Sequence, residues 1–382
     1  MVKRLLNFEK AKQKTFFLWG QRQTGKSYLM HEQFGEAIYI DLLKSDLFAK
    51  YSSKPYLLRE ELAASNPKGH VVIDEIQKIP ILLDEVHWLI ENKKLKFALC
   101  GSSARKLRRE HANLLGGRAI RYELFGFVSE ELKSDFNLQI MLNRGYLPPH
   151  YLSEDYIEML RSYIGDYLRD EIAAEGLVRA IPTFAKFLDS ASLGDTEIIS
   201  LSSFGRDCGV SPNTIKEYYQ ILVDTLIGCF VEAYSGKTKR RIVQSPKFYF
   251  YDVGIVNLLA KRGIIEHGSH NFGKAFENWV FHEINAYRAY SRKYFDISYW
   301  QLSKVTEVDF ILDRMRVGIE AKGSNNITSD HLVGLRSLAS EFKNLKNKIV
   351  VCCDSTARKT EDGILILPYS KFAQMLWAGE II

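Results

Sequence analysis

The chain has 382 residues, of which 46% are hydrophobic and 26% are charged, and its formal net charge is +6. This length accommodates about two or three domains with their own cores, and the composition excludes a disordered chain. No apolar run approaches the roughly 18 residues that span a bilayer, and the charged N-terminal segment excludes a signal-peptide core. The five cysteines form no metal-binding spacing, which indicates reduced thiols. We therefore expect a cytoplasmic protein without a membrane partner.

The first motif lies between a predicted strand and a predicted helix. The apolar run TFFLW (15–19) has the composition of a buried strand, and GQRQTGKS (20–27) follows it. This octapeptide matches the pattern G-x-x-x-x-G-K-[ST] without a gap. Gly20 and Gly25 allow the loop to turn its N–H groups toward a phosphate. The positive N-terminus of the helix at 26–34 attracts the same phosphate. The sequence therefore predicts a nucleotide-binding loop.

Two side chains of this loop act on the nucleotide itself. Lys26 brings a positive charge to the β- and γ-phosphates, and the Ser27 hydroxyl ligates a magnesium ion. We therefore expect ATP and Mg²⁺ as cofactors. The predicted nucleotide-binding residues are Gly20, Gln21, Arg22, Gln23, Thr24, Gly25, Lys26, Ser27, Tyr28 and Asp74.

Strands and helices alternate in the following segment, which is typical of a parallel α/β sheet. Strands are predicted at 37–41, 70–75 and 96–103, and helices at about 56–64 and 81–91. The strand HVVIDE ends in two acids. Asp74 is expected to hold the magnesium ion through water, and Glu75 to polarise the attacking water. The alternative is a strand that ends in two solvated acids.

Further polar residues follow the next strand. Ser102 and Ser103 end that strand, where a polar side chain senses the γ-phosphate or positions the water. Arg118, in the sequence GGR, is a candidate charge for the phosphate of a neighbouring subunit or of its own. The alternative for Arg118 is that it caps a helix. The predicted catalytic residues of this region are Lys26, Glu75, Ser102 and Arg118.

The motifs of this region resemble those of a known family. GQRQTGKS, VVIDEIQKIP, ALCGSSARKL, LLGGRAIRYEL and the later RGYLP are similar to motifs of prokaryotic AAA-type ATPases that carry a C-terminal domain of unknown function. The resemblance implies an ASCE-type P-loop ATPase in which the lysine, serine and acids of the first two motifs have the roles given above. We assign residues 1–150 to this domain. Residues 151–195, with apolar residues at helical spacing, are assigned to a helical connector or lid.

A helix-turn-helix is predicted in the middle of the chain. A short helix at about 201–208, a turn at Gly209 and a second helix at 212–226, capped by Ser211, match its anatomy. The residues that follow predict a two-stranded wing, so we assign 196–250 to a winged helix. The exposed positions of the second helix, whose residue types can contact DNA, are Asn213, Thr214, Lys216 and Glu217. The alternative is a packing or protein-interaction module.

Basic residues gather in two short segments. Each cluster has the charge to contact phosphates, and the alternative for each is a solvated surface. The clusters are Arg105, Lys106, Arg108 and Arg109, and, at the tip of the predicted wing, Lys237, Lys239, Arg240 and Arg241.

The last third of the chain predicts a further α/β domain. Helices are predicted at 273–287 and about 328–342, and strands at 297–302, 307–312, 316–322 and 348–353. Glu277 lies on the first helix, Asp309 on a strand, and Glu320 and Lys322 on the next strand. That order is the arrangement of PD-(D/E)xK nucleases. The segment 251–370 also resembles the C-terminal domain that accompanies the AAA-type ATPases, which looks related to restriction-endonuclease folds.

The residue types of this arrangement suit metal-dependent cleavage of DNA. Asp309 and Glu320 are expected to share a magnesium ion, and Lys322, on the same strand face, to orient the attacking hydroxide. Glu277 would complete the environment of the cation. The alternative is a nuclease-like scaffold in which Glu320 and Lys322 hold structure. The pattern is incomplete in two respects, since Asp309 has no preceding proline and Glu307 is an additional acid on the same strand face.

The predicted fold class is α/β, with an AAA-type P-loop ATPase domain, a winged helix and a restriction-endonuclease-like domain at 251–382. The leading function is ATP hydrolysis coupled to DNA binding, with Mg²⁺-dependent DNA cleavage as a further activity. The alternative is a nucleotide-gated regulator or scaffold that binds protein or DNA through an inactive nuclease-like domain. The expected partners are ATP and DNA, and the sequence leaves open a homo-oligomer or a partner protein.

Overall fold

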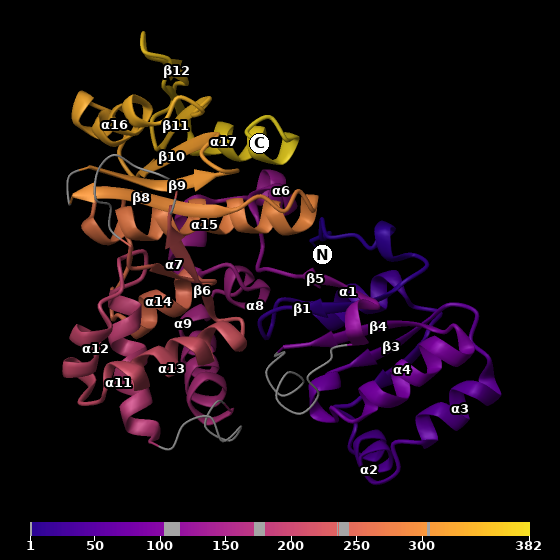
Figure 1. Cartoon of the computed structure of the whole chain (residues 1–382). Helices are drawn as coiled ribbons and strands as arrows, with labels where there is room; N and C mark the ends of the chain where they lie inside the picture. Colours follow the sequence, from indigo (N-terminus) through magenta and orange to yellow (C-terminus); the bar gives the residue numbers. More distant parts are fainter. Residues whose placement is uncertain (1, 103–114, 172–179, 235, 237–243, 304–305) are drawn as a thin grey trace. The chain divides into compact units, whose positions relative to one another are not determined.

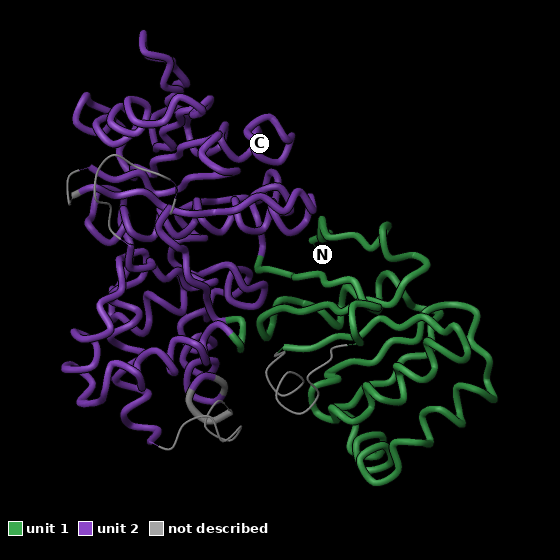
Figure 2. Tube along the Cα trace, in the orientation of Figure 1, with its two compact units in different colours: residues 1–126, 224–226 green, residues 127–223, 227–382 purple. Residues whose placement is uncertain are grey.

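The computed structural model describes residues 2–102, 115–171, 180–234, 236, 244–303 and 306–382 (Figure 1). The predictions made for Ser103 and for both basic clusters lie outside these residues. The chain divides into two compact units (Figure 2). Unit 1 comprises Met1–Gly126 with Asp224–Leu226, and unit 2 comprises Phe127–Val223 with Ile227–Ile382. The first unit thus ends before residue 150, where the sequence analysis sets the end of the first domain.

Within the described residues, unit 1 is built on a parallel sheet with the strand order β2-β3-β4-β1-β5. Its strands are β1 (Thr15–Trp19), β2 (Ile38–Asp41), β3 (His70–Asp74), β4 (Lys96–Gly101) and β5 (Ala119–Glu123). Its helices are α1 (Lys26–Gln33), α2 (Ser45–Ser53), α3 (Leu57–Ser65) and α4 (Leu82–Lys93), with short 3-10 helices at Glu9–Ala11, Ile76–Lys78 and Leu115–Gly117. The predicted parallel α/β pattern is confirmed, and α2 and β5 are additional elements.

The packing of unit 1 explains why β1 reads as a continuous apolar run. β1 lies between β4 and β5, and all five of its residues are buried. Phe17 and Trp19 belong to a core cluster that includes residues of α3 and α4. Phe16 points to the opposite face and stacks on Phe8, with ring centroids 4.5 Å apart. The strand that leads into the nucleotide-binding loop is thus fixed in the middle of the sheet.

In the described part of unit 2, a mixed sheet has the strand order β12-β13-β11-β10-β9-β8-β6-β7. Its strands are β6 (Gly228–Ala233), β7 (Lys247–Phe250), β8 (Ile297–Ser303), β9 (Thr306–Leu312), β10 (Val317–Lys322), β11 (Asn347–Cys352), β12 (Arg358–Lys359) and β13 (Leu365–Pro368). β6 pairs with β7 in an antiparallel manner, as a wing would, but it also pairs in parallel with β8. The domain boundary predicted after residue 250 therefore falls inside one sheet.

Helices cover both faces of this sheet (Figure 1). α15 (His270–Ser291) contacts β7 and β10 on one face, and α16 (Val333–Glu341) contacts β9 and β10 on the other. The further helical elements are α6 (Ser129–Leu132), α7 (Leu138–Arg144), α8 (Pro148–Leu152), α9 (Tyr156–Ser162), a π-helix (Tyr163–Glu171), α11 (Ile181–Leu193), α14 (Val253–Leu259), α17 (Tyr369–Ala378), and 3-10 helices at Lys133–Asp135 and Ser329–Leu332. Among the described residues, no helix has the length and apolar character to cross a membrane.

Two helices and a tight turn follow one another where the helix-turn-helix is predicted. α12 (Leu201–Cys208) and α13 (Pro212–Asp224) flank a turn in which Gly209 has a left-handed φ of 71°. The Ser211 hydroxyl accepts a hydrogen bond from the Thr214 N–H at 3.1 Å and so caps α13. The Thr214 side chain is half-buried. The exposed predicted residues are Asn213, Lys216 and Glu217.

Candidate functional site

The nucleotide-binding loop connects β1 to α1 at the carboxyl edge of the unit 1 sheet. Gly25 precedes α1 with a left-handed φ of 88°, a conformation that glycine adopts without strain. A Cβ atom at Gly20 would lie 2.5 Å from the carbonyl oxygen of Leu124, so a side chain is excluded there. The backbone path of the loop therefore requires both glycines of the motif.

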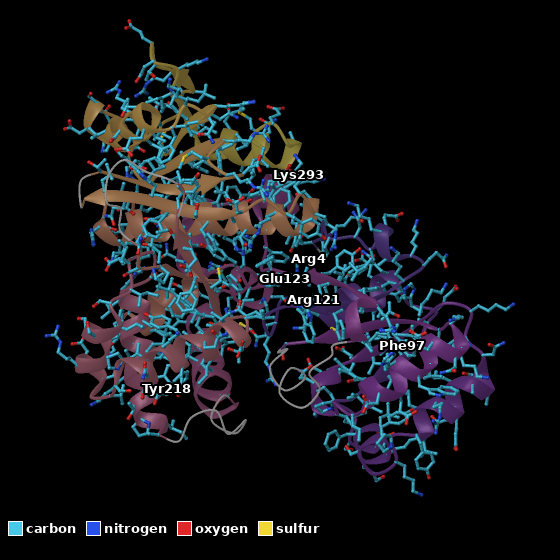
Figure 3. The ribbon with its side chains drawn as sticks, viewed as in Figure 1. Arg4, Phe97, Arg121, Glu123, Tyr218 and Lys293 are labelled. Atoms are coloured by element: carbon cyan, nitrogen blue, oxygen red, sulfur yellow. The ribbon has the colours of Figure 1, made fainter. Side chains whose placement is uncertain are left out.

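Contacts within the loop and from the N-terminal segment hold its shape. The Thr24 hydroxyl donates a hydrogen bond to the Gln21 carbonyl oxygen at 2.9 Å. Arg4, labelled in Figure 3, donates to the Thr24 carbonyl oxygen at 2.5 Å and to the Phe125 carbonyl oxygen at 2.6 Å. Arg4 thus ties the loop to the segment after β5. Arg4 could not be identified from the sequence, because its partners are distant in the chain.

Lys26 is the buried cation of the loop. Only 6% of this residue is exposed. Its Nζ atom donates hydrogen bonds to the carbonyl oxygens of Gly20 at 2.8 Å and Gln21 at 2.9 Å. Burial lowers the pKa of Lys26, and neighbouring acidic groups oppose this shift. Because neutral groups hold the ammonium, it can exchange them for the charged oxygens of a phosphate.

Two acids lie at the end of β3, which β4 separates from β1. Asp74 is buried, and its Oδ2 atom accepts a hydrogen bond from the Tyr39 hydroxyl at 2.7 Å. Its Oδ1 atom accepts a hydrogen bond from the Glu75 N–H at 3.0 Å. Burial raises the pKa of Glu75, and the charge of Lys26 opposes that shift. A carboxylate with a raised pKa is the stronger proton acceptor.

Gln77 connects Glu75 to Ser102. Its Nε2 atom donates hydrogen bonds to Glu75 Oε2 and, at 3.2 Å, to Ser102 Oγ. A Cβ atom at Gly101 would collide with the amide oxygen of Gln77, so the glycine makes room for this side chain. The sequence analysis missed Gln77. The available signal was its place two residues after the acid pair in VVIDEIQKIP.

The loop, the start of α1 and the end of β3 present the groups that would bind a magnesium nucleotide. The first N–H groups of α1 have no intrahelical acceptor, so they are available to an anion. Magnesium is held by few protein ligands together with phosphate oxygens, and the exposed hydroxyl of Ser27 and the carboxylate of Asp74 supply such ligands. Gly20, Gln21, Thr24 and Lys26 are buried, Arg22 and Gly25 are half-buried, and Gln23, Ser27 and Tyr28 are exposed.

Arg118 lies at the other edge of the sheet. Ala119, at the start of β5, pairs with Thr15 at the start of β1, whereas the loop follows the end of β1. The Arg118 guanidinium forms an ion pair with Glu91, and these side chains are 41% and 46% exposed. The structure therefore does not bring Arg118 together with the loop of its own unit. A role of Arg118 at a neighbouring subunit stays a prediction.

A second group of charged residues, which we call the acid cluster, lies in unit 2. It consists of Glu277 on α15 and of Glu307 and Asp309 on β9. Lys247, the first residue of β7, lies among them, and its side chain is 4% exposed. Its Nζ atom lies 3.1 Å from Glu277 Oε1 and 3.8 Å from Asp309 Oδ1, and it forms an ion pair with Glu307. The sequence analysis missed Lys247, because the sequence does not distinguish it from a solvated lysine of the wing.

The carboxylates around Lys247 also accept hydrogen bonds from neutral donors. Burial raises the pKa of Glu277 to about 7, although Lys247 acts in the opposite direction. Burial acts to lower the pKa of Lys247, but the surrounding carboxylates raise it overall, so the ammonium stays charged. The neutral donors are the Tyr249 hydroxyl to Glu277 at 2.6 Å, the Ala321 N–H to Asp309 at 2.8 Å and the Gln301 amide to Glu307 at 3.0 Å.

Glu320 and Lys322 form a separate ion pair in unit 2. Their charged atoms are 2.9 Å apart, and the side chains are 7% and 30% exposed. Within the described residues, Glu320 Oε2 has no hydrogen-bond partner, and burial raises the pKa of Glu320 to about 8. Lys322 and Glu277 line a cavity of about 480 Å³. Lys247 is thus the inner cation of this region and Lys322 the outer one.

The structure brings the predicted residues of unit 2 together, but they do not fit a metal ion. In the part of the chain that the structure describes, no group of three or more His, Cys, Asp and Glu side chains is arranged to hold a metal. Asp309 lies between Lys247 and the Ala321 N–H, and Glu320 is paired with Lys322. Ammonium groups therefore already contact the carboxylates that were expected to share magnesium.

Three families of protein domains match the chain. Residues 12–133 match a family described as an AAA domain. Residues 137–264 and 272–372 match two families described as domains of unknown function, DUF8612 and DUF4143. The first match and the parallel sheet of unit 1 confirm the predicted AAA-type P-loop domain. The other two matches indicate no function.

Two curated relatives of the chain are described as uncharacterized proteins. The uncharacterized proteins Rv2008c of Mycobacterium tuberculosis and Mb2031c of Mycobacterium bovis are each 25% identical to it over 260 residues. These residues are 66% of this chain and 58% of each relative, so the match spans little more than half of the length of the relatives.

Two solved structures have a low similarity to the chain. One is a signal transduction ATPase with numerous domains and a tetratricopeptide repeat sensor from Pyrococcus horikoshii. It is 12% identical, the match covers 77% of this chain and 48% of that one, and the TM-score is 0.24. The other is the Orc1 protein of Aeropyrum pernix in complex with DNA, which is 12% identical, with 66% and 87% coverage and a TM-score of 0.24. At this TM-score, neither similarity supports a conclusion about the chain.

Proposed function

We propose that the chain binds ATP and hydrolyses it at the loop of unit 1. The observation that carries this proposal is the grouping of Lys26 with Asp74 and Glu75 at the carboxyl edge of one parallel sheet. Phosphoryl transfer to water requires a cation for the phosphates, a ligand for magnesium and a group that orients the attacking water. The match of residues 12–133 to the AAA domain supports the same function.

Each side chain of this group has a separate task. Lys26 leaves the carbonyl oxygens of the loop and binds the β- and γ-phosphates. Ser27 and Asp74 would hold the magnesium ion, which would supply charge neutralisation on the phosphates. Glu75 orients the attacking water and accepts its proton. Gln77 keeps the Glu75 carboxylate in place through its amide group.

Phosphate release in the presence of Mg²⁺, measured beside the binding of a fluorescent ATP analogue, tests this proposal. The unchanged chain should bind the analogue and release phosphate, and Lys26→Ala should do neither, because the charge that meets the phosphates is lost. Lys12→Ala is the matched control, since Lys12 is an exposed lysine of the same unit, and it should retain both activities. Normal ATP binding by Lys26→Ala would contradict the proposal.

We also propose that unit 2 binds DNA through α13 and that ATP hydrolysis is coupled to this binding. In a helix-turn-helix, the second helix enters the major groove, and α13 occupies that position after α12 and the turn at Gly209. Its exposed side chains Asn213, Lys216 and Glu217 are of types that contact base edges or phosphates. The alternative is that α13 serves in packing or protein interaction.

A salt titration of DNA binding distinguishes these alternatives. Lys216→Ala should weaken binding and reduce the slope of log affinity against log salt by about 1, because one phosphate contact is lost. Lys186→Ala is the control, since Lys186 is an exposed lysine on α11 outside the proposed contact. An unchanged slope in Lys216→Ala would assign α13 to packing.

The sequence leaves two functions open for the C-terminal domain, Mg²⁺-dependent cleavage of DNA and binding without cleavage. The contacts of Lys247 with the acid cluster favour binding without cleavage. The chain is therefore proposed to be a nucleotide-gated regulator or scaffold that binds DNA. Arg118, exposed at the edge of unit 1 away from its own loop, would act at the phosphate of a second copy in a homo-oligomer.

A further inference from the structure

Buried acids that lie close together need a neutralising cation. The acid cluster gathers the carboxylates of Glu277, Glu307 and Asp309 around one point in unit 2. Asp309 is buried, and Glu277 and Glu307 are partly buried. Such a group is unstable unless an opposite charge offsets the repulsion and the loss of hydration. In metal-dependent enzymes a divalent ion supplies this charge. Lys247 supplies it here.

The contacts of Lys247 are those that a bound cation would make. Its Nζ atom reaches carboxylate oxygens from two elements, Glu277 on α15 and Asp309 with Glu307 on β9. An ammonium is a compact charge with three hydrogen-bond donors, so one lysine can serve this set of acids. The Nζ atom also lies 5.5 Å from the centre of the Tyr299 ring, which favours a cation at this position.

The carboxylates have further bonds that fix them around the ammonium. The second oxygen of Asp309 accepts the Ala321 N–H, and Tyr249 donates to the same oxygen of Glu277 that contacts Lys247. These bonds hold the two carboxylates at the ammonium group. The carboxylates are therefore held by the ammonium together with neutral donors.

We infer that the ammonium group of Lys247 takes the place of the divalent cation in the nuclease-like domain, so that unit 2 neither binds a catalytic magnesium ion nor cleaves DNA. The inference rests on the contacts of the acid cluster alone. It is independent of the nucleotide chemistry of unit 1, and a failure of either one leaves the other intact.

Thermal unfolding of nucleotide-free protein in increasing Mn²⁺ tests the inference. Every protein in the series carries Asp74→Asn, so that the acid of the nucleotide site does not contribute to metal binding. With Lys247 present, Mn²⁺ should not raise the Tm of unit 2, because the ammonium excludes the ion. Lys247→Met keeps the length of the side chain but removes its charge. This variant should unfold at a lower Tm, and Mn²⁺ should raise that Tm again, because the freed carboxylates now bind the ion.

Lys274→Met is the matched control. Lys274 lies on α15, three residues before Glu277, and forms an ion pair, but its partner is Glu197, outside the acid cluster, so Mn²⁺ should not change the Tm of this variant. A folded Lys247→Met protein that does not respond to Mn²⁺ would overturn the inference, because the acids would then not form a cation site at all.

A second measurement decides the question where Lys247→Met does not fold. The protein that retains Lys247 is incubated with plasmid DNA and Mn²⁺, and its Tm is recorded under the same conditions. Neither cleavage nor a Tm increase is expected. Cleavage or metal-induced stabilisation that Asp309→Asn abolishes would overturn the inference, because Asp309 would then act on a bound metal.

Discussion

Each unit contains a lysine that is almost completely buried, but the two lysines have opposite kinds of partner. Lys26 donates hydrogen bonds to neutral carbonyl oxygens of the loop, whereas Lys247 lies among the carboxylates of the acid cluster. Burial lowers the pKa of Lys26, while the carboxylates raise the pKa of Lys247 against the same effect of burial. Burial alone therefore does not decide what a lysine does. Neutral partners can be exchanged for an anionic ligand, and a group of charged partners holds the lysine in place.

The largest expected effect concerns turnover at the exchangeable site. Glu75→Gln should slow ATP hydrolysis by about 100-fold or more, since general base catalysis contributes about 100- to 10,000-fold. ATP binding should persist, because the charge of Lys26 is untouched. Single-turnover phosphate release and a binding titration measure the two quantities. Glu60→Gln, at an exposed acid of α3, is the control, and full turnover in Glu75→Gln would remove this residue from the mechanism.

Replacing Lys247 should destabilise the protein more than replacing Lys26, because the partners of Lys247 are charged and those of Lys26 are neutral. Lys247→Ala leaves several carboxylates without their cation and should lower the free energy of unfolding by about 3–5 kcal/mol. Lys26→Ala removes hydrogen bonds to neutral carbonyl groups and should cost about 1 kcal/mol. Urea denaturation of both variants measures the difference. A larger loss for Lys26→Ala would reverse the comparison on which the account is built.

Lys322→Ala should have a smaller effect than Lys247→Ala. Lys322 is paired with Glu320, but its side chain is 30% exposed, so solvent screens part of the interaction. We expect a loss of about 1 kcal/mol in the same denaturation experiment. A loss as large as that of Lys247→Ala would show that the partly exposed lysine contributes as much to stability as the buried one.

A pH-dependent effect is expected at an acid that neutral donors hold. Glu283, buried on α15, accepts hydrogen bonds from the Ser129 N–H at 2.8 Å and from Trp377 Nε1 at 2.7 Å. Burial raises the pKa of Glu283 from 4.5 to about 7. Its contribution to stability is therefore fully present below pH 4.5 and is lost as the pH rises through about 7.

Glu283→Gln tests this pH dependence. The free energy of unfolding of the unchanged chain should fall between pH 4.5 and about pH 7, and the fall should be shallower in the variant, which has no proton to lose at this position. Denaturation at several pH values gives both curves. Identical slopes would show that Glu283 has the same pKa in the folded and unfolded chain.

The loop and its flanking elements could be predicted because their information is local. The pattern at 20–27 is contiguous, and the apolar run at 15–19 and the acid pair at the end of HVVIDE fall at the observed β1 and β3. α12 is observed at the predicted residues, and α13 ends two residues before the predicted end. Helix caps, glycines and the spacing of apolar residues are properties of neighbouring residues, so these elements can be predicted without knowledge of the fold.

Contacts between distant segments could not be predicted in the same way. The carboxylates that contact Lys247 are distant from it in the sequence, and only the packing of α15 on β7 and the order of the strands bring Glu277 and Asp309 to it. Arg4 meets Phe125 from the opposite end of unit 1. The residue pattern of a strand indicates which of its faces is buried but not which strands lie beside it. The pairing of β6 with β8 could therefore not be predicted, and the domain boundary predicted from the sequence lies between these two strands.

Equilibrium dialysis of Mn²⁺ against the protein, with and without ATP, tests most directly the claim that one buried lysine is exchangeable and the other is fixed. The account predicts that the protein retains Mn²⁺ only when ATP is present, that Lys26→Ala abolishes this retention, and that Asp309→Asn does not change it. Retention of Mn²⁺ in the absence of ATP, abolished by Asp309→Asn, would contradict the account, because the acid cluster would then hold a metal ion despite Lys247.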